Sequence, residues 1–199
     1  MLLLQKASYG VKGGRLSFHL RRARPRLDLL QEVKDFLEGK EFETQEERIK
    51  AIRETSFYWT IPIVSSWSTA NIEAKEAGFK FRVPKVQARN PKNEATPLEV
   101  SMLDVLKQEN REEYWIEDKE ANVLRYMRPI RLTKDCLVCH GTINDDIDHD
   151  GIDPVGIKME GWKEGEIHGA FEIIADLTPM QSAIQDNLYR SILIILALL

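Results

Sequence analysis

The sequence predicts an α+β fold, in which helices accompany a mostly antiparallel sheet. Three observations favour this class. Helical apolar periods fill much of residues 27–77, short stretches typical of strands recur between residues 79 and 177, and a polar turn at residues 117–122 joins two of those stretches as a hairpin. Strands joined by short turns pair antiparallel, and helices then cover the sheet. A chain of 199 residues suits one domain with an appendage.

Residues 1–26 form a basic N-terminal segment without an apolar period, and we expect a flexible arm there. Its most basic part, RLSFHLRRARPR at residues 15–26, has an alternative interpretation as a contact with anionic lipid. From Leu27 to Lys40 the apolar residues recur at helical spacing until Gly39, which predicts an amphipathic helix. No secretory signal is legible, because MLLL is too short for the apolar core of a signal peptide.

A longer helical pattern extends from Thr44 to about Ala77 and completes an N-terminal helical region at residues 27–80. Thr44 is the predicted N-cap, and Glu47 three residues later completes a capping box. Pro62 lies inside the pattern and should kink or break the helix near Ile61. A helix this long has more apolar surface than one small domain needs to bury, which favours a homodimer through this helix.

A sheet domain is expected at residues 81–183. Its predicted elements, in order, are an extended stretch after Gly78, a short helix at residues 98–109, a hairpin with its turn at 117–122, a strand at 166–177 and a helix opened by Thr178-Pro179. This order, with a functional loop before the last strand, is the outline of a sensory sheet domain of the PAS kind.

The C-terminal region, residues 184–199, ends in an apolar run. Nine uncharged residues, SILIILALL, follow Arg190, whereas a membrane span needs about 20 residues. We interpret the run as the start of a membrane-proximal helix, and the alternative is a short buried segment. The net charge of −4 argues against a nucleic-acid partner, because phosphate backbones are bound by positive surfaces.

The chemistry concentrates in RLTKDCLVCHG at residues 131–141, which contains the two cysteines, Cys136 and Cys139, and then His140. The spacing C-x-x-C-H is the attachment signature of haem c, in which two thiols bond the vinyl groups and the imidazole binds the iron. Two other uses remain open. A zinc site would lack a second C-x-x-C to complete it, and a redox-active dithiol would need the element order of a thioredoxin. A structural disulfide is disfavoured because its loop would be very short.

Three stretches, one of them around this motif, resemble the haem-c sensor domains classed as Tll0287-like, which occur in bacterial chemoreceptors and sensor kinases. They are FRVPKVQARNPKNEATPLE at residues 81–99, LRYMRPIRLTKDCLVCHG at 124–141 and MEGWKEGEIHGAFEI at 159–173. The resemblance covers about residues 49–183. It implies a PAS-like fold with a long N-terminal helix, one haem c attached through Cys136 and Cys139 with His140 below the iron, a periplasmic position beside a membrane helix, and dimers that pair or exchange the N-terminal helix. Some relatives carry a cysteine ligand in that helix, and the region near Ser65 has none.

The second axial position of the iron has several candidates in this sequence. Met127, Met102 and His168 are the ligands we favour, and Met159 and His149 are the others. For both favoured methionines the competing interpretation is core packing, because each lies on an apolar strand or helix face. A methionine would close the site and stabilise the reduced iron, whereas an open position would admit NO, CO or O₂.

Arginines and a tryptophan are expected to complete the haem pocket. Buried propionates need cationic or backbone donors, and the candidates are Arg82, Arg89, Arg125, Arg128 and Arg131. Among them we select Arg89 and Arg128. Trp67 is expected to form a wall of the pocket, with stacking in the core as the alternative role.

An acidic loop, DDIDHDGIDP at residues 145–154, matches the opening of a calcium loop through Asp146, Asp148, Asp150 and Gly151. Ile157 occupies the twelfth position, where a bidentate glutamate is required. We therefore favour a solvated acidic loop over a calcium site.

These features favour a periplasmic, membrane-anchored haem sensor domain that responds to redox state or to NO, CO or O₂ and signals through its helices. The competing hypothesis is a monohaem cytochrome that carries electrons between redox partners. We do not expect an enzyme, because no acid–base pair beside an open metal is visible.

Overall fold

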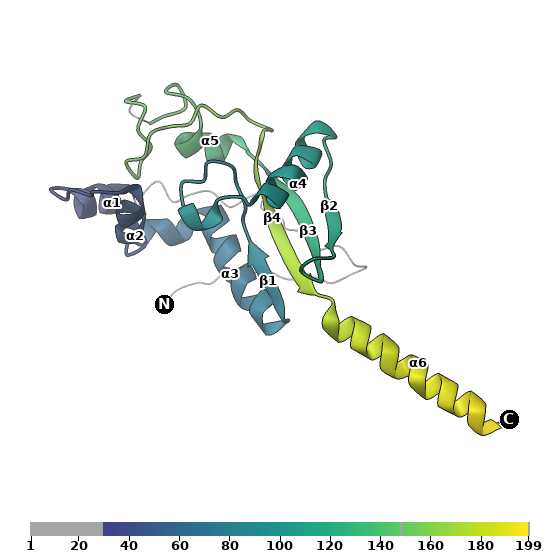
Figure 1. The fold of residues 1–199 in the computed structure, drawn as a ribbon. Coiled ribbons are helices and arrows are strands. Elements are labelled where there is room, and N and C mark those ends of the chain that lie inside the picture. Colours follow the sequence, from purple (N-terminus) through teal and green to yellow (C-terminus); the bar gives the residue numbers. More distant parts are fainter. Residues whose placement is uncertain (1–29, 148, 199) are drawn as a thin grey trace.

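A four-stranded antiparallel sheet forms the centre of the molecule in the computed structural model, which describes residues 30–147 and 149–198 (Figure 1). The strands are β1 (Phe79–Arg82), β2 (Tyr114–Asp118), β3 (Val123–Arg131) and β4 (Ile167–Asp176). Their order across the sheet is β1-β4-β3-β2, so the last strand lies inside the sheet. This confirms the predicted α+β class and its PAS-like antiparallel sheet, including the hairpin of β2 and β3. The basic segment at residues 1–26 lies outside the described residues.

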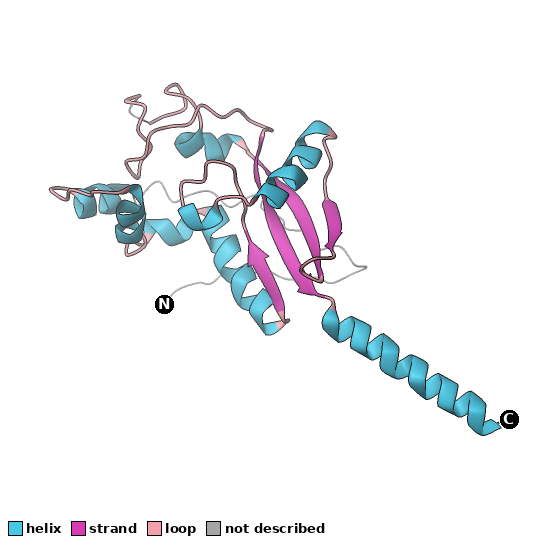
Figure 2. Ribbon diagram, viewed as in Figure 1, coloured by secondary structure: helices cyan, strands magenta, loops and turns pink. Residues whose placement is uncertain are grey.

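Helices lie beside the sheet, and the C-terminal helix extends from the end of its last strand (Figure 2). They are α1 (Leu30–Leu37), α2 (Gln45–Ile52), α3 (Pro62–Glu76), α4 (Pro97–Gln108), α5 (Lys134–His140) and α6 (Thr178–Leu198), with 3₁₀ turns η2 (Phe57–Thr60) and η3 (Pro91–Asn93). Helix α3 packs against β1, and α4 packs against β2, β3 and β4. The N-terminal elements α1, α2 and η2 form a second small core with the loop that precedes β4, made of Val33, Ile52, Phe57 and Val155.

The long helix predicted from Thr44 to Ala77 is divided into α2, η2 and α3. Thr44 caps α2, since its hydroxyl accepts from Glu47 N, while the Glu47 carboxylate accepts from Glu43 N rather than from Thr44 as a complete capping box would require. Pro62 starts α3, which confirms the predicted break there. An additional break follows α2, because the Thr55 hydroxyl bonds to the Ile52 carbonyl and the chain turns to bury Phe57.

Helix α4 covers the sheet with an apolar face and closes the main core. Its start is fixed by a capping box, in which Thr96 and Glu99 bond to each other's backbone N–H groups. The side chains that it buries against β3 and β4 are Met102, Leu103, Leu106, Met127, Ile167 and Ala170. Both methionines favoured as iron ligands, Met102 and Met127, therefore belong to this core.

A β-bulge interrupts the pairing of β3 with β4 at the start of β4. Ile130 is opposite Gly169 and Arg131 is opposite Ile167, so His168 is an extra residue without a partner in the ladder. Bulges re-aim side chains and are frequent beside functional sites. This bulge lets Ile167 and Ala170 both face the main core while His168 is directed to the loop region that precedes β4.

Gly169 follows the bulge at a close approach between two backbone segments. A Cβ atom on Gly169 would lie 2.7 Å from the Pro84 carbonyl oxygen, which accepts a hydrogen bond from Ala170 N. We expect Gly169→Ala to lower the free energy of unfolding by about 1–3 kcal/mol, as overpacking against a fixed neighbour does. Urea denaturation measures this, and unchanged stability would show that the crossing segments separate readily.

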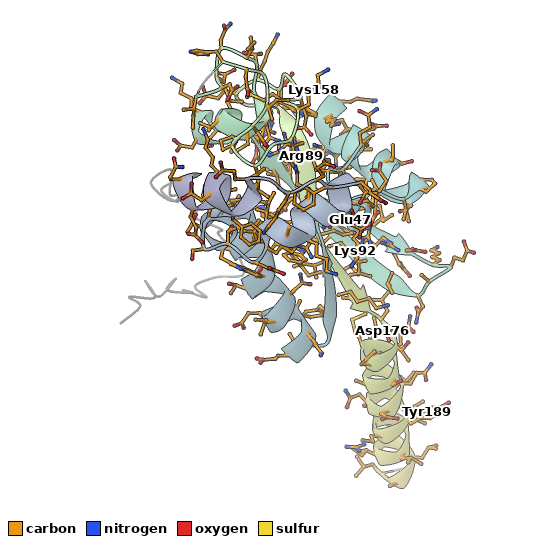
Figure 3. All side chains as sticks on the ribbon, turned by 90° about the vertical axis from the view of Figure 1, so that its left-hand side faces the viewer. Glu47, Arg89, Lys92, Lys158, Asp176 and Tyr189 are labelled. Carbon is orange, nitrogen blue, oxygen red and sulfur yellow. The ribbon has the colours of Figure 1, made fainter. Side chains whose placement is uncertain are left out.

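Helix α6 leaves the body of the protein and points away from it (Figure 1). It has 21 residues, and its exposed apolar side chains include Met180, Ile184, Leu188, Ile192, Leu193, Ile195 and Leu196. Among the described residues, no helix combines the length and apolar content that crossing a membrane requires. Figure 3 shows Asp176 at the junction with the body and Tyr189 on the part of α6 that stands clear of it.

Candidate functional site

Helix α5 carries the C-x-x-C-H motif at the end of β3. Thr133 precedes it as the N-cap, with its backbone N–H and its hydroxyl 3.5 and 3.4 Å from the Cys136 sulfur. Cys136 and Cys139 are both free thiols. The segment that leads to β4 anchors the end of the helix, because Trp162 N donates to the His140 carbonyl at 2.9 Å. The motif residues are thus held by Thr133 at the start of α5 and by the segment around Trp162 at its end.

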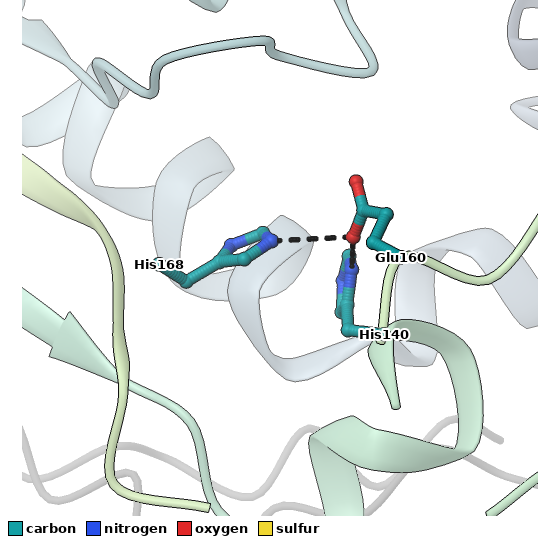
Figure 4. A group of neighbouring side chains, drawn as sticks. All are labelled: His140, Glu160 and His168. Carbon is teal, nitrogen blue, oxygen red and sulfur yellow. Dashed lines mark hydrogen bonds and ion pairs between the residues drawn. The ribbon is translucent and has the colours of Figure 1, made fainter. Parts of the chain in front are cut away.

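His140 contacts a carboxylate that comes from this neighbouring segment. Its Nδ1 atom lies 2.6 Å from Glu160 Oε2, and the side chain of His140 is only 20% exposed. Nε2 of His168 lies 3.5 Å from the same carboxylate oxygen (Figure 4). The two imidazole rings are neighbours, with centroids 4.3 Å apart. One oxygen atom of Glu160 therefore faces both histidines.

The other oxygen of Glu160 faces two cations. Lys85 Nζ donates to Oε1 at 2.9 Å, and Arg89 Nε lies 3.2 Å from it. The site is closed on one side by Trp162, whose ring meets the His168 ring edge-on at 5.0 Å. Lys85 lies 5.7 Å above the same tryptophan ring. Glu160 is therefore the common partner of two imidazoles and two cationic side chains.

Arg89 links this cluster to α5 and to the acidic loop. One of its amino groups donates to the Cys139 carbonyl at 2.6 Å, and the other donates to the buried Asp153 carboxylate. Asp153 in turn accepts from the backbone N–H groups of Val155 and Ile157. Arg89 therefore positions the end of the motif helix as well as Glu160.

Burial and hydrogen bonding set the charge of each group in the cluster. Burial lowers the pKa of His140 to about 4, which outweighs the effect of Glu160, so the imidazole is neutral at pH 7. Burial would raise the pKa of Glu160, but hydrogen bonds with His140 and Lys85, the contact with His168 and the charge of Arg89 hold it far below its usual range. Burial also lowers the pKa of Lys85 and raises the pKa of Cys139 to about 12.

These protonation states define what His140 can do. A neutral imidazole carries one N–H group, and a carboxylate only accepts, so Nδ1 of His140 donates to Glu160. Nε2 of His140 then keeps a free lone pair, which is the donor that a metal ion requires. Ligand atoms of His140, Glu160 and His168 also lie within 4.8 Å of one another, close enough for a single small ion. The site is thus suited to binding a metal through imidazole nitrogen.

The structure separates the favoured sixth-ligand candidates from one another. His168 lies beside His140, as described above. Met127 and Met102 are 0% and 1% exposed in the main core, which is the packing role that the sequence also allowed. His149 is exposed, and its Nδ1 is bonded to the Ile143 carbonyl. Met159 belongs to the loop before β4, where its N–H donates to the Gly151 carbonyl.

Of the five arginines considered for propionates, Arg89 is the one placed in the His140 cluster. Arg82 and Arg125 instead form ion pairs with buried Glu99 and Glu172 beneath α4. Arg131 is bonded to Asn110 and Glu112 at the surface. Arg128 is half-buried on β3 and Trp67 is half-buried on α3, and their roles in a haem pocket stay predictions.

The acidic loop uses its carboxylates to stabilise its own turns. Asp146 accepts from the N–H groups of Ile147 and Gly151, and Asp150 accepts from Ile152 N. Asp148 lies outside the described residues. Asp146 is 4% exposed, so this carboxylate is buried rather than solvated as expected, and the preference for an acidic loop over a calcium site stays a prediction.

Glu160, Lys85, Asp153 and Trp162 were not selected from the sequence. Lys85 lies in the first of the three stretches that carry the family resemblance, and Glu160 and Trp162 lie in the third. Those stretches were the only signal, because a lone glutamate in a loop has no periodicity or spacing that marks it.

Comparisons with known proteins agree with the resemblance. The sequence profile of the family described as Tll0287-like matches residues 21–175. Among solved structures, the crystal structure of the cyanobacterial haem protein Tll0287 is similar, with 20% identity and a TM-score of 0.48 over 75% of this chain and 88% of that one. The comparison with curated proteins returned no match.

Proposed function

Because the chain belongs to the Tll0287-like family, we propose that it is a sensor domain that holds one covalent haem c and responds to redox state or to NO, CO or O₂. The haem would supply a redox-active iron with an axial position for a ligand. The protein would supply the attachment, the proximal imidazole and the elements that move.

The residues of α5 fit this group. Cys136 and Cys139 are free thiols three residues apart on one helical turn, and His140 follows at the position that brings an imidazole under the iron. The observation that carries the proposal is the donation from His140 Nδ1 to Glu160, which fixes the tautomer whose Nε2 would be available to hold iron. Arg89, which is already at the site, is the candidate for a propionate contact.

The output would pass through the helices. β4 starts at the histidine cluster and leads into α6, so a change of the iron ligands has a direct covalent route to that helix. We propose a periplasmic location, since this type of haem attachment requires export, with anchoring at a membrane near the apolar end of α6. The interrupted helical region of α2, η2 and α3 is the proposed site of homodimer formation.

A reduced pyridine haemochrome spectrum, followed by CO titration of the ferrous protein, tests the proposal. Covalent haem with a spectral shift on adding CO is the result expected of a gas sensor. Covalent haem that ignores CO would support redox sensing, or the competing role of an electron carrier. A protein without covalent haem that binds zinc at His140, Glu160 and His168 would overturn the proposal.

A further inference from the structure

We propose that Glu160 is a positioning residue that increases the basicity of His140 and thereby lowers the reduction potential of the iron, while Lys85 limits this effect. The inference rests on the proposed function, because it requires that His140 binds iron. Glu160 lies in one of the stretches that carry the family resemblance, but neither that resemblance nor the C-x-x-C-H motif assigns it a role.

The first support is the contact itself. Nδ1 of His140 and Oε2 of Glu160 are 2.6 Å apart, a distance typical of a strong hydrogen bond to a charged acceptor. Both side chains are about one-fifth exposed, so water competes little with this bond. A carboxylate that accepts from Nδ1–H shifts electron density toward Nε2 and makes the imidazole a stronger ligand. Ferric iron gains more from a stronger donor than ferrous iron, so the potential falls.

The second support is the arrangement around the other carboxylate oxygen. Lys85 Nζ donates to Oε1 at 2.9 Å, and its side chain is 10% exposed. The Lys85 backbone is fixed as well, because its N–H donates to the Asn93 carbonyl and its carbonyl accepts from Ala95 N. A cation held at this place draws charge away from Oε2. Lys85 should therefore weaken the effect of Glu160 on His140.

The two residues thus act in opposite directions on one bond. Removing the negative charge of Glu160 should favour ferrous haem, and removing the positive charge of Lys85 should favour ferric haem. His168 lies on the same carboxylate oxygen as His140, so it would modulate Glu160 rather than bind the opposite face of the iron. A purely structural role for Glu160 predicts no such pair of opposite shifts.

The experiment is a spectroelectrochemical titration of the haem-loaded protein and its variants. Glu160→Gln should raise the ratio of ferrous to ferric haem at a fixed solution potential at least about tenfold, which is 59 mV for one electron. Lys85→Gln should lower that ratio. Glu164→Gln and Lys158→Gln are matched controls, because both side chains are exposed on the same loop and undergo the same change of charge.

Two outcomes would overturn the inference. One is a Glu160→Gln shift no larger than that of Glu164→Gln in protein whose haemochrome spectrum shows full covalent haem. The other is a Lys85→Gln shift in the same direction as that of Glu160→Gln. If Glu160→Gln does not load haem, Glu160→Asp keeps a carboxylate on a shorter side chain that weakens the bond to His140, so it should raise the ratio of ferrous to ferric haem above that of wild type, and an unchanged or lower ratio would count against the inference. Wild-type protein without covalent haem would instead refute the proposed function.

Discussion

Replacing both Cys136 and Cys139 by serine is expected to abolish covalent haem completely and to leave the fold intact. A serine hydroxyl does not add to a haem vinyl group under the conditions in which a thiol does, so both thioether bonds are lost. Both thiols are free and partly buried on α5, and serine occupies a similar volume. Mass spectrometry of the denatured protein measures the result, as the loss of the mass of one haem.

The single variants provide the internal control for this experiment. Cys136→Ser and Cys139→Ser each keep one thiol, so each should retain some haem that survives denaturation. Far-ultraviolet circular dichroism should match wild type in all three variants, which separates loss of attachment from loss of folding. Covalent haem in the double variant would contradict the assignment, because no other cysteine exists in the sequence.

The second large effect concerns two buried glutamates beneath α4. Glu99 is 1% exposed and Glu172 is 0% exposed, and Arg82 and Arg125 pair with them. Glu172 Oε2 has no hydrogen-bond partner as long as both carboxyls are ionised. When Oε2 of Glu172 is protonated, its O–H group donates a hydrogen bond to Glu99, and the oxygen atom no longer lacks a partner. Burial and this bond to Glu99 raise the pKa of Glu172 to about 8.

This raised pKa predicts that the protein loses stability as the pH increases above neutrality. An ordinary glutamate, with a pKa of 4.5, has lost its proton in the unfolded chain, whereas folded Glu172 keeps its proton up to about pH 8. The folded state therefore binds more protons in this window, and its free energy of unfolding falls as the pH rises. We expect a decrease of roughly 2 kcal/mol between pH 6.5 and 8, measured by urea denaturation.

Glu172→Gln tests the origin of this slope. The amide donates to Glu99 at every pH, so the variant should match wild type near pH 6.5 and exceed its stability at pH 8. Glu117→Gln, an exposed change on β2, is the matched control and should leave the slope unchanged. The measurement starts at pH 6.5 because the folded state lowers the pKa of His140. Below pH 6.5 the unfolded chain therefore binds more protons at this residue, and the free energy of unfolding rises with pH. An equal slope in Glu172→Gln would assign the effect to other groups.

Local patterns were sufficient to predict the elements of the sheet domain. The turn between β2 and β3, the helix α4 and the strand β4 each follow from the spacing of residues close in sequence. The capping box of Thr96 with Glu99 at the start of α4 was not predicted. The break at Pro62 follows from the missing N–H of proline. The break after α2 was not predicted, because it depends on burying Phe57 against Val155, about a hundred residues away.

The cluster around Glu160 could be predicted only in part. The C-x-x-C-H spacing identified Cys136, Cys139 and His140, since all three lie on one helical turn. Lys85, Glu160 and His168 come from separate segments, which are brought together by the pairing of β4 with β1 and β3 and by backbone bonds such as those from Ala170 N to Pro84 and from Trp162 N to His140. The orientation of His168 depends on a bulge, which the simple alternation of a strand does not contain.

Strand β4 connects the histidine cluster to helix α6 as one continuous element. The strand is ten residues long, about 33 Å in extended form, with the His168 bulge at one end and Asp176 at the other. Asp176 accepts from Thr178 N at the start of α6, and the Asn122 side chain bonds to Thr178 and Gln181 on the first turn of that helix. Because β3 pairs along the length of β4 and β1 pairs with its second half, we expect a displacement at the histidine end to reach α6 as a change in the direction of the helix rather than as a local distortion of the loop.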